Sequence, residues 1–406
     1  MNERKKVELL APAGNMEKLL TAFHFGADAV YIAGKSFGLR AFADNFDEKE
    51  MVEAIDIAHA LGKKVYVTVN IYARNADFDG LKKYLVFLQN AGADAAIMSD
   101  AGVIAVSKEV APGLPIHIST QANTLNKYAV KFWHEQGAER VVLARECRFE
   151  DIAEINSFVP TCETEVFVHG AMCISYSGRC LMSDFLTGRG ANRGECVQAC
   201  RWEWQITEKE HEDKPLSVRE DARGTYVFNS KDLNLIHRIK ELIECGVASF
   251  KIEGRMKSPY YVATVVNAYR RAIDAYYARP DDYETDERIA ADLFKTTHRQ
   301  FTEGFTFYDG EVMQNYETSR ATGDSEFLAV VKDYSDGVAT VEMRSRFKEG
   351  QRVEILSPSD VFGRKVEIKN LRDVNDLPVE DAKRVQQILK FDCPYRLLPN
   401  DILRTE

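Results

Sequence analysis

Four cysteines occur within one short stretch of this 406-residue chain, and thiols grouped in this way can bind a metal. Six residues separate Cys173 from Cys180, and three separate Cys196 from Cys200. Soft thiolate ligands select zinc or iron–sulfur clusters. Zinc ribbons favour closer cysteine pairs, so the wider first gap fits them poorly. The residues therefore predict a metal site with these four ligands, while spacing alone does not decide between zinc and iron.

The alternative for a cysteine is burial as a small apolar residue, and we expect it for the other four. They are scattered along the chain: Cys147, Cys162, Cys245 and Cys393. No apolar run is long enough to span a membrane, and the opening MNERKK is too polar for a signal peptide. We therefore expect a cytoplasmic protein with reduced thiols and no membrane partner.

A second group of chemically capable residues lies on predicted strands. Over residues 248–253, Phe250 and Ile252 alternate with Lys251 and Glu253. Successive side chains of a strand point to opposite faces, so the aliphatic residues meet the covering helices and the polar ones face inward. The same alternation places further polar side chains on the inner face: Asn70, His117, Gln121, His169 and Arg255.

These inward residues could form an active site, because buried charges are costly unless they are paired or functional. We predict Lys251, Glu253 and His169 as catalytic residues, with His169 able to give or take a proton. Lys251 and Glu253 could instead simply pair, and His169 could be structural.

For substrate binding we predict a second set of residues, whose cations could hold an anionic ligand. Arg255 and Lys257 follow the last of these strands directly. The full predicted set is Asn70, His117, Gln121, Arg145, Arg255 and Lys257.

Arginine and tryptophan accompany the cysteines. Four arginines lie in this segment, followed by Trp202 and Trp204: Arg179, Arg189, Arg193 and Arg201. Arginine with aromatic residues suits an RNA loop, through phosphate contacts and base stacking, although a solvated loop with locally buried tryptophans is the alternative. The net charge of −10 argues against a general nucleic-acid coating protein but leaves local RNA binding open.

A repeated sequence motif predicts the strands and helices that must position these residues. A glycine precedes a short apolar strand at Gly26, Gly92, Gly137 and Gly246, and helical stretches separate the copies. Eight strand candidates result: residues 7–11, 28–33, 64–70, 94–99, 115–121, 139–144, 164–169 and 248–253. Alternating strands and helices in this number predict an α/β fold, a TIM-like (β/α)₈ barrel. A doubly wound open sheet is the alternative, but no Gly-x-Gly-x-x-Gly follows the first strand.

The remaining segments predict the domain organisation. A Cys-rich insertion at 170–230 follows strand seven and should lie over the barrel mouth, and a helix over 231–244 leads to strand eight. The barrel domain is expected at 1–285 and a linker at 286–325. From 326 to 406 the pattern alternates, with turns at Ser335-Asp-Gly and Glu349-Gly, which predicts a small antiparallel β-barrel domain.

Several of these motifs together resemble the collagenase-like peptidase family U32. The stretch Glu165 to Ser183 carries the first two cysteines and matches the family signature. Further matching segments are Leu10-Ala-Pro-Ala-Gly14, Ser119-Thr-Gln121, Asn192 to Trp202, Phe228-Asn-Ser-Lys-Asp232 and Lys251-Ile-Glu-Gly-Arg-Met-Lys257. Within the family, the chain resembles the branch of tRNA hydroxylation proteins.

The resemblance implies a [4Fe–4S] cluster on Cys173, Cys180, Cys196 and Cys200. It implies an enzyme that forms 5-hydroxyuridine at the tRNA wobble position without molecular oxygen, with prephenate as co-substrate and tRNA as partner. A paralogous subunit is a further expected partner. Prephenate is a dicarboxylate, which would give the inward cations a use.

Other functions stay open at this point. Relatives of the same family imply hydroxylation of ribosomal RNA or of a quinone ring, and the family label implies a collagenase-like peptidase. We find no His-Glu-x-x-His zinc helix and no Gly-x-Ser-x-Gly elbow, which weighs against a peptidase. The fourth hypothesis is a non-catalytic RNA-binding scaffold with a structural cluster.

Overall fold

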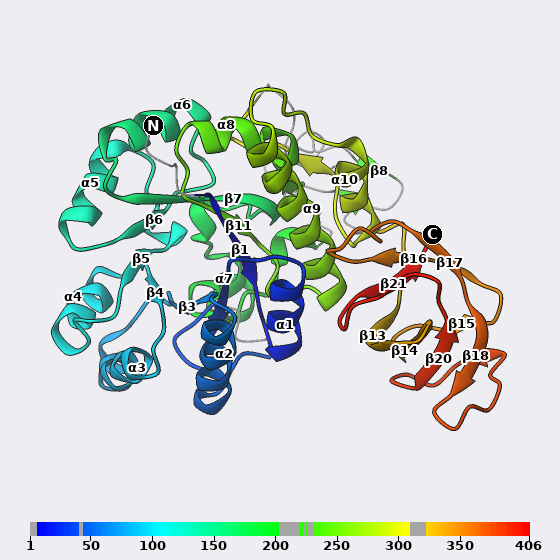
Figure 1. Ribbon diagram of the computed structural model, residues 1–406. Coiled ribbons are helices and arrows are strands. Elements are labelled where there is room, and N and C mark those ends of the chain that lie inside the picture. Colours follow the sequence, from blue (N-terminus) through cyan, green and yellow to red (C-terminus); the bar gives the residue numbers. More distant parts are fainter. Residues whose placement is uncertain (1–5, 40–43, 203–219, 222–223, 226–229, 309–321) are drawn as a thin grey trace.

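A computed structural model of the chain describes residues 6–39, 44–202, 220–221, 224–225, 230–308 and 322–406 (Figure 1). Most of the polar part of the insertion, with Trp204 and residues 208–219, lies outside the described residues, as do 309–321 of the predicted linker. In the part of the chain that is described, no helix has the length and apolar character needed to cross a bilayer.

Eight parallel strands close into a barrel. They are β1 (Glu8–Pro12), β2 (Ala29–Ala33), β3 (Lys64–Val69), β4 (Ala95–Met98), β5 (Ile116–Ile118), β6 (Arg140–Val142), β7 (Glu163–Ala171) and β11 (Ser249–Ile252). Each strand pairs with the next, and β11 pairs with both β7 and β1, which leaves no open edge between them. The predicted (β/α)₈ barrel is therefore confirmed.

Helices cover the outside of the barrel. They are α1 (Met16–His24), α2 (Glu48–Ala60), α3 (Phe78–Asn90), α4 (Ala101–Val110), α5 (Lys127–Glu135), α6 (Phe149–Phe158), α8 (Ile239–Glu244) and α9 (Pro259–Ala278). Gly26, Gly92, Gly137 and Gly246 each adopt a positive φ beyond a helix end. A left-handed residue that ends a helix favours glycine, which explains the repeated motif.

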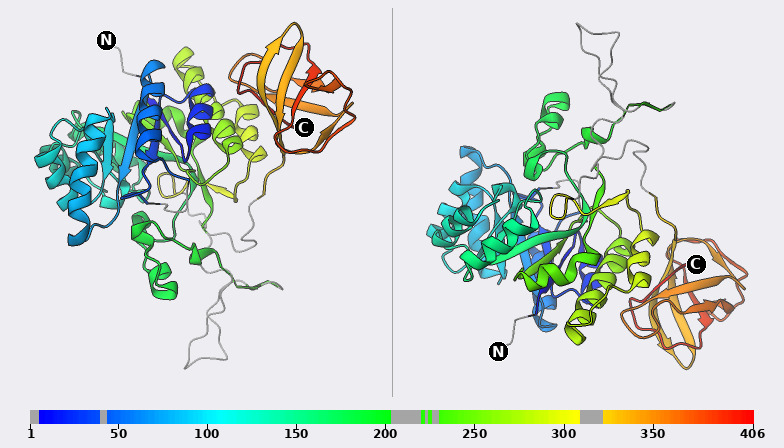
Figure 2. Two further views of the ribbon diagram at one scale, coloured as in Figure 1. Left: turned by 90° about the horizontal axis from the view of Figure 1, so that it is seen from below. Right: turned by 90° about the horizontal axis from the view of Figure 1, so that it is seen from above.

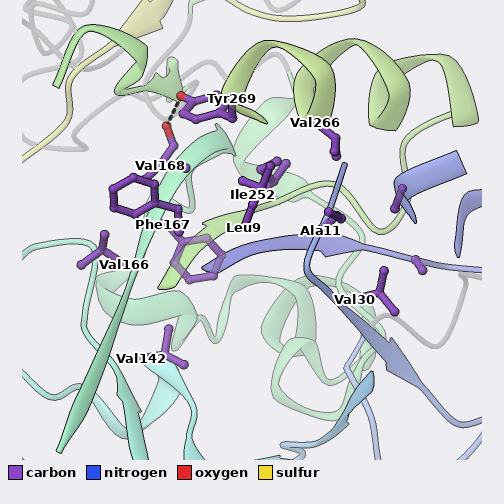
Figure 3. Close-up of a cluster of buried hydrophobic side chains, with 14 of the residues drawn as sticks. Leu9, Ala11, Val30, Val142, Val166, Phe167, Val168, Ile252, Val266 and Tyr269 are labelled. Carbon is purple, nitrogen blue, oxygen red and sulfur yellow. Dashed lines mark hydrogen bonds between the residues drawn. The ribbon is translucent and has the colours of Figure 1, made fainter. Parts of the chain in front are cut away.

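Two apolar layers hold the barrel together. The larger lies between strands and helices. Figure 3 shows Leu9 and Ile252 of this layer near Val266 of α9, and Val168 beside Tyr269 of the same helix. The smaller lies inside the lumen, beside the first four strands, and consists of Leu10, Ala29, Tyr31, Tyr66, Ala95 and Ile97. The other half of the lumen is polar, so the apolar filling of an ordinary barrel is incomplete here.

A β-bulge distorts β7 near its C-terminal end. Phe167 pairs with Lys251, but the next pair joins His169 to Ile252, so one extra residue stands on β7. Beyond it, Gly170 has a φ of 107°, and a Cβ there would lie 2.3 Å from the Glu253 carbonyl oxygen. Only glycine allows this close approach of the two strands.

Two further strands extend the sheet beyond β7. The antiparallel strand β10 (Asp232–Asn234) pairs with the end of β7, and β12 (Phe301–Thr302) pairs with β10. The predicted helix over 231–244 is therefore wrong in its first half, where β10 and a short 3₁₀ turn precede α8. The segment expected to be a linker carries α10 (Glu287–Asp292) and β12.

The C-terminal segment forms a separate antiparallel sheet with its own core, as predicted. Its strands are β13 (Phe327–Ser335), β14 (Val338–Met343), β16 (Arg352–Leu356), β17 (Lys365–Glu367), β18 (Lys369–Asp373), β20 (Ile388–Asp392) and β21 (Ile402–Thr405), and the short β15 (Phe347–Lys348) pairs with β19 (Asp381–Ala382). Asp336 and Gly337 both have positive φ in the β13–β14 hairpin. Two such residues form a tight turn that matches strand twist.

The C-terminal domain lies beside the last helices of the barrel domain (Figure 2). Buried ion pairs join the two. Arg404 of β21 is fully buried and bonds Asp292 of α10 and Glu354 of β16. Lys295 lies 2.6 Å from the same Glu354 carboxylate. Because this group of charges spans both domains, we expect it to fix their relative position.

Replacing Arg404 with alanine should destabilise the protein by about 3–5 kcal/mol, because Asp292 and Glu354 would remain buried without their main cation. Denaturant unfolding followed by circular dichroism measures the change. The control Arg346→Ala removes an ion pair with Asp381 at a side chain that is 69% exposed, and should leave the midpoint nearly unchanged. Equal midpoints for both variants would contradict the assigned role of Arg404.

Candidate active site at the barrel mouth

A cavity of about 140 Å³ opens at the C-terminal ends of the barrel strands. Six predicted polar residues line it together: Asn70, Gln121, Arg145, Lys251, Glu253 and Arg255. Three of the four clustered cysteines line it as well: Cys173, Cys180 and Cys196. Active sites of (β/α)₈ barrels lie at this end, so the predicted polar residues and the cysteines share one candidate site.

Buried charges fill the lumen below the cavity. Arg140 of β6 is 3% exposed, and its guanidinium lies 2.5 Å from Glu8, 2.6 Å from Glu163 and 3.2 Å from Glu165. Burial disfavours the charged form of Glu8, but Arg140 and the hydroxyl groups around it hold the pKa of this carboxyl below its ordinary value. The network therefore carries formal charges inside the barrel.

Lys251 connects this network to the cavity. Its ammonium donates to the second oxygen of Glu165 at 2.7 Å, and Glu165 is fully buried. The same nitrogen lies 4.6 Å from the centre of the Tyr31 ring and 5.6 Å from that of Phe167, within the range of cation–π attraction. Carboxylate and aromatic faces thus orient one cationic donor toward the ligand space.

Two more cations stand at the sides of the cavity. Arg145 donates to Glu253 at 3.2 Å, and its guanidinium lies 4.0 Å above the Phe167 ring. Arg255 is 3% exposed and donates to the Thr68 hydroxyl and to the Leu39 carbonyl. The suggested direct pair of Lys251 with Glu253 does not form, since Lys251 pairs with Glu165 and Glu253 with Arg145.

Neutral amides complete the lining. Asn70 donates to the Gln121 side chain at 2.9 Å and accepts from the Leu39 amide. The Gln121 carbonyl accepts from Arg179 of the insertion at 2.9 Å. These bonds tie β3, the loop after β5 and the insertion to one another, which fixes the polar wall of the cavity.

The cysteine insertion is fastened across the barrel mouth. Ser177 donates to Glu146 and to Asn123, which lie in the loops after β6 and β5. On the other side, Arg193 makes two bonds to Asp77. Backbone contacts add to these, since the Tyr72 amide donates to the Asn192 carbonyl. The insertion is therefore anchored to three separate loops.

The four clustered thiols lie near one another. Burial raises the pKa of Cys173, and the neighbouring Cys180 and Cys196 raise it further, while the Ser175 amide and Arg145 oppose this. Burial also raises the pKa of Cys200, which feels the other three thiols. Cys200 thus belongs with the quartet although it does not line the cavity.

The thiols are not packed as ligands of one ion. Among the described residues, no three His, Cys, Asp or Glu side chains are placed to hold a single metal ion. Tetrahedral zinc would require sulfur atoms about 3.8 Å apart. In a four-iron cluster each cysteine binds a different iron, so its sulfurs lie farther apart. Both zinc and iron–sulfur clusters take thiolate ligands of this kind.

Two predicted histidines are not in the cavity. His117 faces the lumen as predicted, but at the N-terminal side, with its ring 4.6 Å from Tyr66. Burial and nearby cations lower its pKa well below the ordinary value, so it stays neutral. The predicted inward position of His169 is wrong, because the β7 bulge turns it outward between Tyr261, Tyr269 and Phe301.

The environment of His169 is that of a structural residue. Its ring nitrogen lies 3.4 Å from the Tyr269 hydroxyl, and burial lowers its pKa to about 3.

Lys257, predicted as a substrate-binding residue, does not line the cavity either. It donates to the Thr297 carbonyl and lies 5.0 Å from the Tyr261 ring, on the outer side of the barrel end.

The strand alternation did not identify several lining residues. Glu146 directly follows Arg145 after a strand, and a charged pair at that point was an available signal. Phe305 comes from the turn after β12. The same turn packs on α6, where the Phe307 ring stacks on Phe149 at a centroid distance of 5.1 Å. Nothing in the local sequence indicates that this turn reaches the barrel mouth.

The cavity can bind an anionic or polar ligand next to a sulfur-rich centre. Its described lining includes cations, amides and thiols but no histidine. Hydrolysis by serine or cysteine needs a nucleophile with an adjacent base, most often histidine. The described lining holds no histidine, and its one reported hydroxyl–carboxylate contact joins Ser177 to Glu146. The geometry therefore favours the binding of an anionic or polar ligand at the barrel mouth.

Comparison with known proteins agrees with the geometry of barrel and C-terminal domain. The model of "Peptidase family U32" matches residues 14–315, and that of "Peptidase family U32 C-terminal domain" matches 324–404. The tRNA hydroxylation protein P1 of Bacillus subtilis is 42% identical, over 98% of this chain and 95% of that protein. The tRNA hydroxylation protein P of Escherichia coli is 38% identical, over 87% and 86%.

A third relative modifies a different RNA according to its name. The 23S rRNA 5-hydroxycytidine synthase of Escherichia coli is 32% identical, over 88% of this chain and 54% of that longer protein. The two family models together cover the barrel from α1 onward, the cysteine insertion and the C-terminal sheet. The chain belongs to peptidase family U32.

Proposed function

We propose that this protein is a tRNA-modifying hydroxylase that forms 5-hydroxyuridine at the wobble position. The observation that carries the proposal is the placement of three clustered cysteines and three buried or half-buried cations in the lining of one barrel-mouth cavity. Relatives named tRNA hydroxylation proteins match nearly the whole chain, which supports the substrate class. Cytoplasmic location follows from this substrate.

A [4Fe–4S] cluster is the proposed cofactor, held by Cys173, Cys180, Cys196 and Cys200. The four thiols are electrostatic neighbours at one end of the barrel, and thiolates are the ligands that this group takes. When bound, such a cluster supplies electron transfer or a Lewis-acidic iron. The raised thiol pKa values mean that ligation must displace protons, so we expect assembly of the cluster to weaken as the pH falls.

Prephenate is the proposed co-substrate, and Arg145, Arg255 and Lys251 are its proposed ligands. Each guanidinium has five donors in a fixed fork, so Arg145 can keep Glu253 and still bind a carboxylate. Lys251 would add a third cationic donor from the cavity floor. Asn70 and Gln121 would bind neutral oxygens or a base edge, and Glu253 could accept a proton.

Three alternatives differ from this proposal in substrate or in chemistry. Hydroxylation of ribosomal RNA would use the same cavity. This chain matches only 54% of the longer ribosomal RNA enzyme but 95% of a tRNA hydroxylation protein, which favours tRNA. Quinone hydroxylation likewise remains an alternative within the family. A peptidase is disfavoured by the lack of histidine in the described cavity lining. A paralogous subunit remains a proposed partner.

Nucleoside mass spectrometry of tRNA tests the substrate. Expressing this protein in a bacterial host without its own tRNA hydroxylation proteins should restore 5-hydroxyuridine and nucleosides derived from it. Ribosomal RNA from the same cells serves as the comparison. Unchanged tRNA together with new hydroxylated cytidine in ribosomal RNA would overturn the tRNA assignment.

Iron analysis tests the cofactor. Anaerobically purified protein should carry iron and acid-labile sulfide and absorb broadly in the visible range, and Cys173→Ser or Cys200→Ser should lose most of both. The matched control is Cys245→Ser, whose thiol bonds the Leu242 carbonyl outside the quartet. Equal iron in all variants, or bound zinc instead, would contradict the proposed cluster.

Substitution of the cavity cations tests the site. Lys251→Met and Arg255→Met should lower tRNA hydroxylation by about 10²-fold or more while iron content is retained, because both side chains contact the ligand space. Lys257→Met is the control, since Lys257 lies outside the cavity. Full activity of Lys251→Met would show that the cavity is not the reaction site, whereas loss would exclude a purely structural scaffold.

A further inference from the structure

An exposed apolar segment stands beside the cavity mouth. The short helix α7 (Met182–Thr187) and its flanks lie between two cavity-lining residues, Cys180 and Ala191. Asn192 donates to the Cys180 carbonyl at 3.2 Å, so the segment leaves the rim and returns to it. Figure 2 shows this part of the insertion, in green, standing off the body of the barrel.

Large apolar side chains of this segment point to solvent. Phe185 is 90% exposed and Leu181 is 71% exposed. They lie four residues apart, so they share one face of α7. Single exposed apolar residues are common, but several together next to a ligand cavity mark an interaction surface. We name Leu181, Phe185 and Arg189 the rim segment.

The charge around the rim segment indicates its partner. Residues 170–202 hold four arginines but only one aspartate and one glutamate, in a chain whose net charge is −10. Arg193 pairs with Asp77 outside this range, so a small positive excess is left on the insertion. Arg189 follows the Gly188 cap of α7 directly and is exposed. A locally basic surface with exposed aromatic faces suits single-stranded RNA, because arginine binds phosphate and rings stack on bases.

The position of the rim segment relative to the cavity is fixed by hydrogen bonds. Ser183 donates to the Glu195 carbonyl and accepts from the Val197 amide, so α7 is tied to the loop segment that carries Cys196. Arg193 ties the same part to Asp77. A base stacked on α7 would therefore lie at a set distance from the cysteines.

We propose that the rim segment stacks against an unpaired nucleotide next to the target base and so directs that base into the cavity. The inference rests on the proposed function. It adds which residues recognise the RNA, and that the RNA is single-stranded where it binds. The cavity lies behind the rim, within the barrel mouth. A base inside a duplex cannot reach such a cavity, so the RNA must be single-stranded there.

Binding of two RNA probes tests the proposal: a hairpin with an unpaired uridine-containing loop, and a fully paired duplex of the same composition. Wild-type protein should bind the hairpin more tightly. Phe185→Ala should raise the hairpin Kd by about 5- to 100-fold and leave the duplex Kd nearly unchanged. Arg189→Gln should reduce the salt dependence of binding by about one unit in the log–log slope.

Matched controls are Phe132→Ala on α5, where the ring is 50% exposed, and Arg288→Gln, where the side chain is 88% exposed. Both should leave the Kd of the hairpin unchanged. The iron content of each variant checks that the insertion has kept its fold.

Three outcomes separate the hypotheses. Loss of hairpin binding in Phe185→Ala with retained iron supports the rim segment, even if tRNA hydroxylation itself is absent and another RNA is the substrate. Unchanged hairpin binding together with normal tRNA hydroxylation overturns the rim inference and leaves the proposed function intact. Unchanged binding with a loss of self-association, measured by light scattering, shows that the segment is a protein interface and also overturns the inference.

Discussion

The barrel depends on a chain of charges buried in its lumen. Glu8, Arg140, Glu165 and Lys251 come from β1, β6, β7 and β11, which close the barrel. Burying these groups costs free energy, and the cost is offset only because each meets an opposite charge at hydrogen-bond distance. Removing one member would leave its partners buried and charged, so the network requires all of its members together.

This network also determines what the cavity can present to a ligand. In the lower half of the polar lumen, Glu8 and Glu165 pair with Arg140. Lys251 is the upper end of the network, held between Glu165 and the Tyr31 ring. From the apolar half beside β1 to β4, Tyr31 and Ile97 line the same cavity. Together with Arg145 and Arg255, the result is a site with cations on fixed supports, and preorganised charge of this kind stabilises anions without rearrangement.

Close contact between β7 and β11 links the barrel wall to the cysteine insertion. Gly170 lets the Glu253 carbonyl approach, and the insertion begins directly after this point. The bulge turns His169 away from the lumen and lets β7 bond β10. A larger side chain at Gly170 would push the strands apart and displace both Glu253 and Cys173, so the geometry of cavity and cluster depends on the same residue.

Much of this arrangement could be predicted from sequence. Periodicity predicts the eight strands, the glycines that end the helices and the C-terminal sheet. It also predicts the inward position of Lys251, Glu253 and Arg255, because regular strands alternate their side chains strictly. The grouping of the cysteines at the barrel mouth follows from their place after strand seven. These are local or topological properties, and the sequence determines them directly.

Tertiary structure decided the rest. The outward turn of His169 results from one extra residue in β7, which strict alternation cannot anticipate. Three further features depend on which strands and turns meet in space. They are the height of His117 in the lumen, the pairing of Lys251 with Glu165 instead of Glu253, and the presence of Phe305 at the cavity. Such contacts join residues far apart in the chain, and only the closed barrel sets the distances between them.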